Sequence, residues 1–328
     1  MKSKWVVVSN LILFVSISGG ITSRPSASAV EVRRVLLATG IGPEFSDLVI
    51  AVKRGLFEKY GIQAELKPFV DANVALDLIL TGSADIGDAS EAGGLVRRSK
   101  GGKIYVVGSG ATATKAMAVV VRGNISQPKD LLGKRVGYSA GTGGHYFFER
   151  YVRHYGLDVN QIKQVPAQAP ELLAALNRGD IDAFFLWEPW VSRALKEVSN
   201  TKIIEWNGDN NVFLVTQYWY FSQRMIDDRK LGVDAVRALV DAHMWIKSNF
   251  DEAGRIVAAT YNLDPQLASE LVRRWKWGEP RLTNQTRMKI REAGEFLSRA
   301  GVLVVLPKLD DYLHPEFLKE VNPRFVEE

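Results

Sequence analysis

The sequence predicts an α/β protein with two similar lobes, a ligand cleft between them and a mostly helical C-terminal part. Three observations predict this fold class. Predicted strands and helices alternate from residue 35 to about residue 216. One spacing of glycine, aspartate and glutamate occurs twice, and the apolar residues beyond Ser222 recur at helical spacing. The alternation favours largely parallel sheets that carry helices on both faces.

The repeated pattern is the most informative of the three observations. Gly82-x-x-Asp85-x5-Glu91 recurs as Gly179-x-x-Asp182-x5-Glu188, with each residue 97 positions later. Two such units in one chain predict two lobes, and ligands bind at the carboxyl ends of the strands in such lobes. The alternative is that the repeat has no functional meaning, because any two strand–helix–strand units tend to have glycine after the helix and aspartate before the next strand.

The first lobe begins with an apolar run that ends in a glycine-containing turn, which predicts a buried strand. Its four predicted strands are Val35–Thr39, Ala64–Phe69, Asp85–Gly87 and Ile104–Gly108. Its helices are predicted at Ser46–Tyr60, ended by Gly61, and at Asn73–Leu80, closed by Gly82.

The second lobe follows the same rules. Its strands are predicted at Ala118–Val121, Lys134–Tyr138, Ile162–Val165 and Asp182–Leu186, and its helices at Pro128–Leu132, Phe147–Tyr155 and Pro170–Asn177. Val212–Thr216 is interpreted as the strand that returns the chain to the first lobe. Helical spacing then recurs in Val233–Asn249, Asp264–Trp275 and Thr283–Ala300.

These elements predict the domain boundaries. We expect residues 30–117 and 218–328 to form lobe 1, which includes the C-terminal helices, and residues 118–217 to form lobe 2. The chain would then cross between lobes twice, near Met117–Val119 and near Thr216–Tyr218. Hinge closure around a ligand is the usual motion of two lobes joined in this way.

Residues 1–29 predict a signal peptide. Lys2 and Lys4 precede an almost wholly apolar stretch, Trp5 to Ile17, that is too short to span a bilayer comfortably. Ala27-Ser28-Ala29 is the small-x-small pattern of a signal peptidase site, so we expect cleavage after Ala29 and a soluble periplasmic chain. An uncleaved anchor is the alternative, and the absence of cysteine excludes a lipid-anchored lipoprotein.

Composition excludes several classes of function. The chain has no cysteine, which excludes disulfides, a thiol nucleophile and a cysteine-based metal site. Three of its 42 basic residues and none of its 37 acidic residues lie in the signal peptide, so the remainder has a formal charge of only +2 and no nucleic-acid footprint. The four histidines lack a metal-ligand spacing, and no GxSxG elbow occurs. We therefore expect neither an enzyme nor a cofactor.

A glycine-rich turn is the first candidate for the ligand site. Ser139-Ala140-Gly141-Thr142-Gly143-Gly144 joins a predicted strand to a predicted helix, where unpaired N–H groups and the helix dipole attract anions. Thr142 adds a hydroxyl, and His145 stands at the helix start, where a neutral imidazole could donate to an anion. An ordinary glycine-rich turn with a threonine cap is the alternative.

Further candidates follow the equivalent strands of the two units. Ser90 and Glu91 follow one strand, and Trp187 and Glu188 follow the other, so both pairs are expected to meet across the cleft. Trp187 offers an apolar wall or a face for a cation, with core packing as the alternative. Glu188 could accept from a ligand donor, although Glu188-Pro189 also suits a helix start.

Two other segments complete the set of candidates. Gly42-Pro43-Glu44-Phe45-Ser46 opens the first helix at the cleft side, which makes Phe45 and Ser46 candidate contacts. Thr216-Gln217-Tyr218-Trp219-Tyr220 is rich in aromatic rings with polar tips. It is interpreted either as a crossing segment packed by rings or as part of a pocket that includes Tyr218. One catalytic option remains, an acid–base pair of Glu91 and Glu188 across the cleft.

Several motifs, taken together, identify a family resemblance. Ala51-x-x-Arg54-Gly55-Leu56-Phe57-Glu58-Lys59-Tyr60-Gly61 resembles the A-x-x-x-G-L-F-x-x-x-G opening of nitrate/sulfonate/taurine-type solute-binding proteins, which are similar to the thiamine-pyrimidine-precursor proteins. Gly82-x-x-Asp85-Ile86-Gly87, Asp130–Val136, Gly179-x-x-Asp182-Ala183 and Trp187-Glu188-Pro189 match in order and spacing. The resemblance covers residues 35 to 189; Glu188 replaces the aspartate that many members carry after the tryptophan.

The resemblance implies a type II periplasmic binding fold and delivery of a small solute to an ABC importer. It implies ligand contacts at Phe45–Ser46, Ser90, Thr142 to His145 (with Gly143 and Gly144), and Trp187–Glu188. A sulfonate-like anion, an aromatic acid or a zwitterion is the expected solute, bound by a monomer that partners a permease and an ATPase. The alternatives are a pyrimidine-precursor binding protein, a synthase-like enzyme of the same superfamily and a periplasmic sensor domain.

Overall fold

The structure is a computed structural model that describes residues 33–327 of the 328-residue chain. The predicted signal peptide and its cleavage after Ala29 lie outside the described residues. Within residues 33–327, no helix combines the length and the apolar character that a membrane-spanning segment requires.

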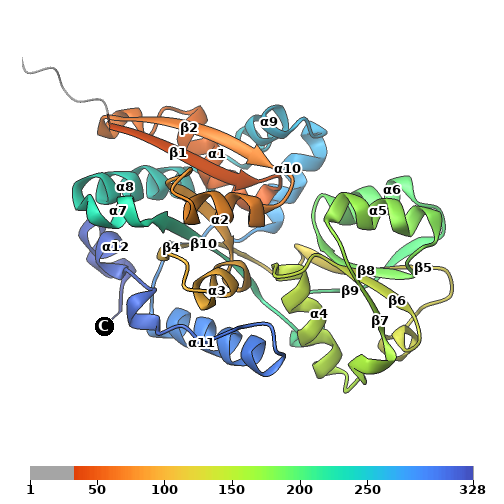
Figure 1. Ribbon diagram of the computed structural model, residues 1–328. Coiled ribbons are helices and arrows are strands. Elements are labelled where there is room, and N and C mark those ends of the chain that lie inside the picture. The colour runs from red at the N-terminus through yellow and green to blue at the C-terminus, as the bar shows by residue number, and fades with distance from the viewer. Residues whose placement is uncertain (1–32, 328) are drawn as a thin grey trace, which may run out of the picture. The chain divides into compact units, whose positions relative to one another are not determined.

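Two five-stranded sheets form the framework, one in each lobe (Figure 1). The sheet of lobe 1 has the order β2-β1-β3-β10-β4, and the sheet of lobe 2 has the order β7-β6-β8-β5-β9. The strands of lobe 1 are β1 (Arg33–Gly40), β2 (Ile62–Phe69), β3 (Ile86–Ser90), β4 (Ile104–Ala113) and β10 (Val215–Ser222). Those of lobe 2 are β5 (Met117–Arg122), β6 (Arg135–Tyr138), β7 (Lys163–Pro166), β8 (Ala183–Trp187) and β9 (Thr201–Trp206).

Both sheets are largely parallel, as expected: four of the five strands in each run in the same direction, and one strand, which was not foreseen, runs against them. In lobe 1, β1 runs parallel to β2 and β3, whereas β10 runs antiparallel to β3 and β4. In lobe 2, β6 runs parallel to β7 and β8, whereas β5 runs antiparallel to β8 and β9. The antiparallel strand has the same physical cause in each sheet, because β5 and β10 are the strands that enter from the other lobe.

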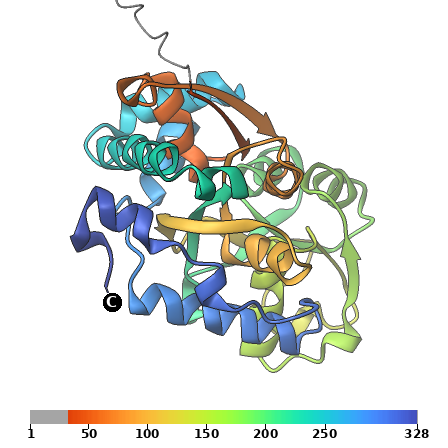
Figure 2. The same ribbon diagram turned by 60° about the vertical axis from the view of Figure 1, so that its left-hand side comes forward.

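Helices cover both sheets. Lobe 1 holds α1 (Ser46–Lys53), α2 (Ala72–Leu80) and α3 (Glu91–Ser99), and lobe 2 holds α4 (Gly143–His154), α5 (Ala169–Arg178) and α6 (Trp190–Glu197). The C-terminal helices are α7 (Gln223–Asp227), α8 (Arg229–Ile246), α9 (Phe250–Tyr261), α10 (Pro265–Arg274), α11 (Asn284–Arg299) and α12 (Pro315–Val321). They pack on lobe 1: α8 contacts α1 and α12, α9 contacts α1 and α10, and α11 contacts α3 (Figure 2).

The first helix is shorter than its sequence pattern predicted. It ends at Lys53, because Gly55 adopts a left-handed backbone conformation (φ 67°) that closes the helix. The Gly55 N–H donates to Val52 O at 3.1 Å and the Leu56 N–H donates to Ala51 O at 2.9 Å, which is the bond pair of a Schellman motif. Gly61 caps a separate 3₁₀ turn, Glu58–Tyr60.

The repeated aspartates occupy equivalent positions in the two lobes. Before β3, Asp85 accepts through Oδ2 from Leu36 N at 2.9 Å and donates through its own N–H to Leu36 O at 2.8 Å. Before β8, Asp182 makes the same two bonds with Arg135 N and O, both at 2.8 Å. Each aspartate therefore ties the start of its own strand to the neighbouring parallel strand.

The two crossing segments are joined by one buried side chain. Asn207 is fully buried; its Oδ1 accepts from the N–H groups of Ala116 and Met117 at 3.0 Å, and its Nδ2 donates to the carbonyls of Ala113 and Phe213 at 2.9 Å. The crossings lie between β4 and β5 and between β9 and β10. The predicted crossing at Thr216–Tyr218 instead lies inside β10, which pairs on both of its edges.

Candidate functional site

One pocket lies between the carboxyl ends of the strands of the two lobes. Its empty space measures about 370 Å³, open solvent at the mouth included. Lobe 1 lines it with Glu44, Phe45, Asp71, Ala72, Asn73, Ala89, Ser90, Gly93 and Gln217, and lobe 2 lines it with Met117, Thr142, Gly143 and Trp187. Five of the eleven candidate residues are in this lining: Phe45, Ser90, Thr142, Gly143 and Trp187. The strand ends thus position a shared pocket.

Glycines let the walls of the pocket approach one another. A Cβ at Gly40 would lie 2.5 Å from the Phe45 ring, so only glycine at the end of β1 leaves room for that ring beside the pocket. A Cβ at Gly143 would lie 2.6 Å from Met117 Cε and 3.1 Å from Ser90 Oγ. Gly143 therefore lets the start of α4 in lobe 2 reach the start of α3 in lobe 1.

The N–H groups at the start of α4 are largely hydrogen-bonded to the N-cap residue, Thr142. Thr142 Oγ1 accepts from Gly144 N at 3.1 Å and from His145 N at 3.5 Å, and it donates to Ser139 O at 2.6 Å. These bonds occupy the hydroxyl and two of the N–H groups that an anion was expected to use. Thr142 accordingly acts as a helix cap at the edge of the pocket.

The start of α3 is more open to a ligand. Ser90 is the N-cap residue of this nine-residue helix, and its side chain makes no capping hydrogen bond. Ser90 and Gly93 both line the pocket, so the first turn of the helix faces it. Uncapped N–H groups and the helix dipole make such a turn suitable for an anionic group.

Aromatic and thioether groups form the apolar walls. Trp187 ends β8 and pairs in register with Met117 of β5, so these two side chains are placed together at the edge of the sheet of lobe 2. Phe45 lies in lobe 1, in the 3₁₀ turn Pro43–Phe45. All three residues are at least nine-tenths buried and line the pocket. Such rings suit the apolar or flat part of a small organic solute.

The polar wall of the pocket is acidic. Glu44 and Asp71 line it, and no lysine, arginine or histidine does so among the described residues. Burial raises the pKa of Glu44 to about 8, and the charge of Glu188 adds to this shift. Asp71 is partly satisfied, since its Oδ1 accepts from Asn73 N at 2.8 Å. Gln217, beside Ser90 in the sheet, is 4% exposed, and its Oε1 has no hydrogen-bond partner.

Six candidate residues do not line the pocket, and three of them, Ser46, Gly144 and Glu91, are buried near it. The Ser46 hydroxyl donates to Pro43 O at 2.5 Å and is fully buried. Gly144 lies behind the cap, where a Cβ would stand 2.7 Å from Phe185 O. Glu91, the first residue of α3, is 6% exposed, its Oε2 has no hydrogen-bond partner, and burial raises its pKa to about 7.

The other three candidates are held by neighbours outside the pocket. The His145 ring stacks on Tyr138 with centroids 4.5 Å apart, and its Nδ1 accepts from Gly141 N at 3.2 Å. Tyr218 is 1% exposed within β10, where burial holds the pKa of its phenol well above the ordinary value.

Glu188 joins the lobes from outside the pocket. It accepts from Ser192 N at 2.9 Å, which matches the helix-start alternative, and it pairs with Arg274 Nη1 of lobe 1 at 2.7 Å. The Arg274 guanidinium also lies over the Trp206 ring of lobe 2, 5.3 Å from its centroid.

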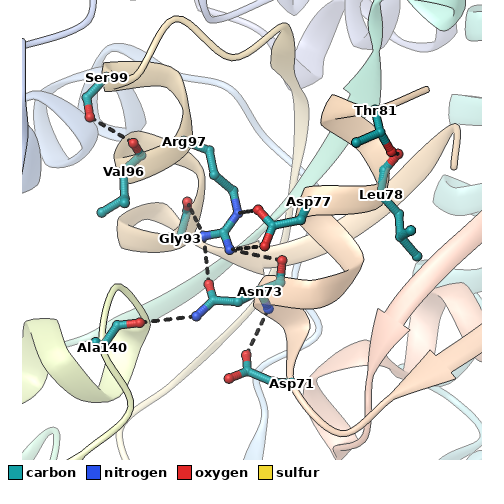
Figure 3. Close-up of polar contacts among 10 residues, drawn as sticks. All are labelled: Asp71, Asn73, Asp77, Leu78, Thr81, Gly93, Val96, Arg97, Ser99 and Ala140. Atoms are coloured by element: carbon teal, nitrogen blue, oxygen red, sulfur yellow. Dashed lines mark hydrogen bonds and ion pairs between the residues drawn. The ribbon is translucent and has the colours of Figure 1, made fainter. Parts of the chain in front are cut away.

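Two hydrogen bonds beside the pocket also connect the lobes. Asp71 Oδ2 accepts from Ser139 Oγ at 3.1 Å. Asn73 Nδ2 donates to Ala140 O at 3.2 Å (Figure 3). Arg97 fixes the orientation of the Asn73 amide, because its Nη1 donates to Asn73 Oδ1 at 2.8 Å. As Figure 3 shows, Arg97 is itself held by the Asp77 carboxylate, so the contact to lobe 2 rests on an ordered network in lobe 1.

Comparison with known proteins gives the family of the chain. A family model described as NMT1/THI5 like matches residues 42–243, and the chain belongs to this family. The taurine-binding periplasmic protein of Escherichia coli (strain K12) is 28% identical over 137 residues, which is 42% of this chain and 43% of that protein. A putative aliphatic sulfonates-binding protein of the same organism is 25% identical over 188 residues, 56% of this chain and 59% of that one. The alignments thus span about half the length of these relatives.

Solved structures of similar fold include binding proteins and an enzyme. The alkanesulfonate-binding protein SsuA from Xanthomonas axonopodis pv. citri, bound to MOPS, superposes with a TM-score of 0.77 at 18% identity, over 87% of this chain and 99% of that one. The desulfurization enzyme DszB superposes with a TM-score of 0.65 at 19% identity, over 89% and 99%. The type II periplasmic binding fold with two lobes is therefore confirmed.

Proposed function

We propose that this chain is an extracytoplasmic solute-binding protein that captures a small anionic or zwitterionic organic solute and delivers it to an ABC importer. The observation that carries the proposal is the shared pocket, in which Ser90 of lobe 1 and Trp187 of lobe 2 line one small cavity. A solute held between lobes that are joined by two short crossings can be enclosed and released by their relative movement.

The pocket supports a solute of mixed character. The uncapped start of α3 offers N–H groups to an anionic group, and Phe45, Met117 and Trp187 offer apolar contact to a short carbon chain or a ring. The sulfonate- and taurine-binding relatives agree with such a solute. The permease and ATPase partners, the periplasmic location and the monomeric state are parts of the same proposal.

The experiment that tests this function is a binding screen on the purified chain without residues 1–29. Sulfonates, nitrate, aromatic carboxylates and pyrimidines are added one at a time, and a ligand is detected by the rise in melting temperature that mass action requires. The ligand should be recovered unchanged after prolonged incubation.

A matched pair of variants makes the screen specific. Trp187→Ala should abolish the ligand-induced shift, whereas Trp245→Ala, which removes a tryptophan under Arg54 of lobe 1 far from the pocket lining, should keep it. Chemical turnover of the bound solute, or an unaltered shift in Trp187→Ala, would contradict the proposed function.

A further inference from the structure

The polar wall of the pocket contains acidic groups and, among the described residues, no basic one, which a simple anion would not match. Glu44 is 4% exposed and lines the pocket, yet no ion pair joins its carboxylate to a cation among the described residues. Its neighbour in the lining, Asp71, is also acidic. The Glu44 carboxylate accepts a hydrogen bond from its own backbone N–H. A buried carboxylate that lacks a cation is still costly, so such a group is normally found opposite a cation or further hydrogen-bond donors.

A second observation points to a donor on the ligand. Gln217 Oε1 is a buried acceptor without a partner, and its residue lines the same pocket. An unpaired buried acceptor costs free energy that a ligand N–H can recover. Glu44 and Gln217 therefore present acceptor oxygens, and no basic side chain of the described lining competes with a ligand for them.

Other acids lie near Glu44. Glu188, outside the pocket lining and paired with Arg274, adds to the rise in the pKa of Glu44 through its charge. Behind the wall, Asp47 and Asp88 converge, since a Cβ at Gly110 would lie 3.4 Å from an Oδ2 of each.

These two carboxylates differ in their partners, and Asp47 also accepts from Leu48 N at 3.0 Å. Asp47 accepts from Trp219 Nε1 at 2.7 Å and lies 3.5 Å from His243 Nδ1, whereas both oxygens of Asp88 are buried without partners. Burial raises the pKa of the nearby Tyr261 phenol, so this group is neutral and does not offset the charge of the acids. Burial, with the charges of Asp47 and Glu44, holds the pKa of Asp88 well above its ordinary value, so this carboxyl is neutral near pH 7. A cation in the pocket would be attracted mainly by the ionised Glu44 carboxylate.

We propose that Glu44 and Gln217 form a subsite for a protonated amine, so that the preferred solute is an amine-bearing zwitterion rather than an amine-free sulfonate or carboxylate. This inference rests on the proposed function and specifies its solute. The anionic end of the solute would lie at the start of α3, and the ammonium would lie at the Glu44 wall, with Trp187 beside the carbon chain.

The decisive experiment compares solutes that differ only in the amine. Taurine is compared with ethanesulfonate, β-alanine with propanoate, and phenylalanine with 3-phenylpropanoate, by calorimetry at pH 6, pH 7 and pH 8. At least one amine-bearing member should bind about tenfold more tightly than its partner, as expected for a charged hydrogen bond. Its affinity should rise between pH 6 and pH 8, because the Glu44 carboxyl, with its pKa near 8, must ionise to pair with the ammonium.

Variants assign the preference to the named residues. Glu44→Gln should remove both the amine preference and its pH dependence, and Gln217→Leu should reduce the preference by a few-fold. Glu91→Gln is the matched control, because Glu91 is an equally buried acid with a raised pKa that does not line the pocket. It should keep the preference.

A readout on the unaltered protein guards against a folding defect in the variants. Calorimetry at pH 7 in two buffers of different ionisation enthalpy should detect proton release when the amine-bearing solute binds. Preference for the amine-free members, affinity that falls as the pH rises, or binding by no member of any pair would overturn the inference. A different binder in the broader screen would still support the proposed function.

Discussion

The two lobes share a strand order but differ in what they bring to the pocket. In each sheet, three parallel strands are followed by one antiparallel strand that arrives from the other lobe. Lobe 1 supplies the acids and Gln217 and an uncapped helix start, whereas lobe 2 supplies Trp187, Met117 and a helix already capped by Thr142. The two lobes thus have equivalent backbones but different side chains in the pocket. The difference lies in the residues that immediately follow or flank the strands.

The connection between the lobes should show the largest effect. Asn207→Ala leaves four buried backbone groups of the crossing segments without their partners, and each such loss costs roughly 1 kcal/mol or more. We expect the free energy of unfolding to fall by about 4 kcal/mol in urea titrations. Asn124→Ala, at an exposed loop position, is the control and should change it by less than about 0.5 kcal/mol. Equal effects of the two variants would show that the lobes do not depend on Asn207.

The buried acids Glu44 and Glu91 of lobe 1 should make the ligand-free protein less stable at high pH. The pKa values of Glu44 and Glu91 are raised to about 8 and about 7 from 4.5, so the folded protein binds more protons than the unfolded chain in this interval. Their stabilising contribution is complete below pH 4.5 and is lost as the pH rises to 8, on the order of 1 kcal/mol per pH unit for each group. Melting temperatures of wild type should fall over this range more steeply than those of Glu44→Gln. Parallel curves would exclude a raised pKa at Glu44.

The repeated aspartates test the equivalence of the lobes directly. Asp85→Asn and Asp182→Asn each weaken a bond to the neighbouring strand and an ion pair, with Arg224 and Arg135 respectively. We expect losses of about 1–2 kcal/mol at pH 7 in both variants. The pKa of Asp182 is lowered mainly by Arg135, so its contribution is present above pH 3.8 and is lost as the pH falls below that value. A large loss in one variant and none in the other would break the equivalence.

The contact shown in Figure 3 should have the smallest effect. Asn73→Ala removes the single hydrogen bond that this side chain donates to Ala140 of lobe 2 (Figure 3). We expect ligand affinity to fall about threefold, because one partly exposed hydrogen bond contributes roughly 0.5–1 kcal/mol. Thr81→Ala, which alters the other end of the same helix without touching lobe 2, should leave affinity unchanged. An unchanged affinity in Asn73→Ala would remove this contact from the closure of the lobes.

Much of the fold could be predicted because it depends on local signals. Gly82 and Gly179 have positive φ at the ends of helices, and the aspartates that follow them begin buried strands, as their pattern indicated. Gly55 shows the limit of such signals, since glycine inside an apolar helical pattern did not reveal where α1 ends. The reversed direction of β5 and β10 also escaped prediction, because a buried apolar run reads the same in a parallel or an antiparallel sheet.

The pocket was harder to predict because it depends on distant partners. Ser90 and Trp187 follow equivalent strands, so their position could be inferred from the repeat. Glu188 follows a strand in the same way, but Arg274, 86 residues away, pairs with it. Gln217 was not predicted as a site residue, because it lies among aromatic residues in β10. A polar side chain within that buried run was the only sequence signal for a role in the pocket.

The origin of the fourth strand in each sheet has a consequence for the order in which the protein can form. A chain that emerges amino end first completes β4 at Ala113, but the strand that must lie between β3 and β4 begins only at Val215. Until roughly a hundred further residues have appeared, the edges of β3 and β4 lack their shared neighbour, whereas lobe 2 needs nothing beyond β9. The segment inserted in the middle of the chain can therefore mature before the lobe that precedes it, and the early strands must be shielded from aggregation meanwhile.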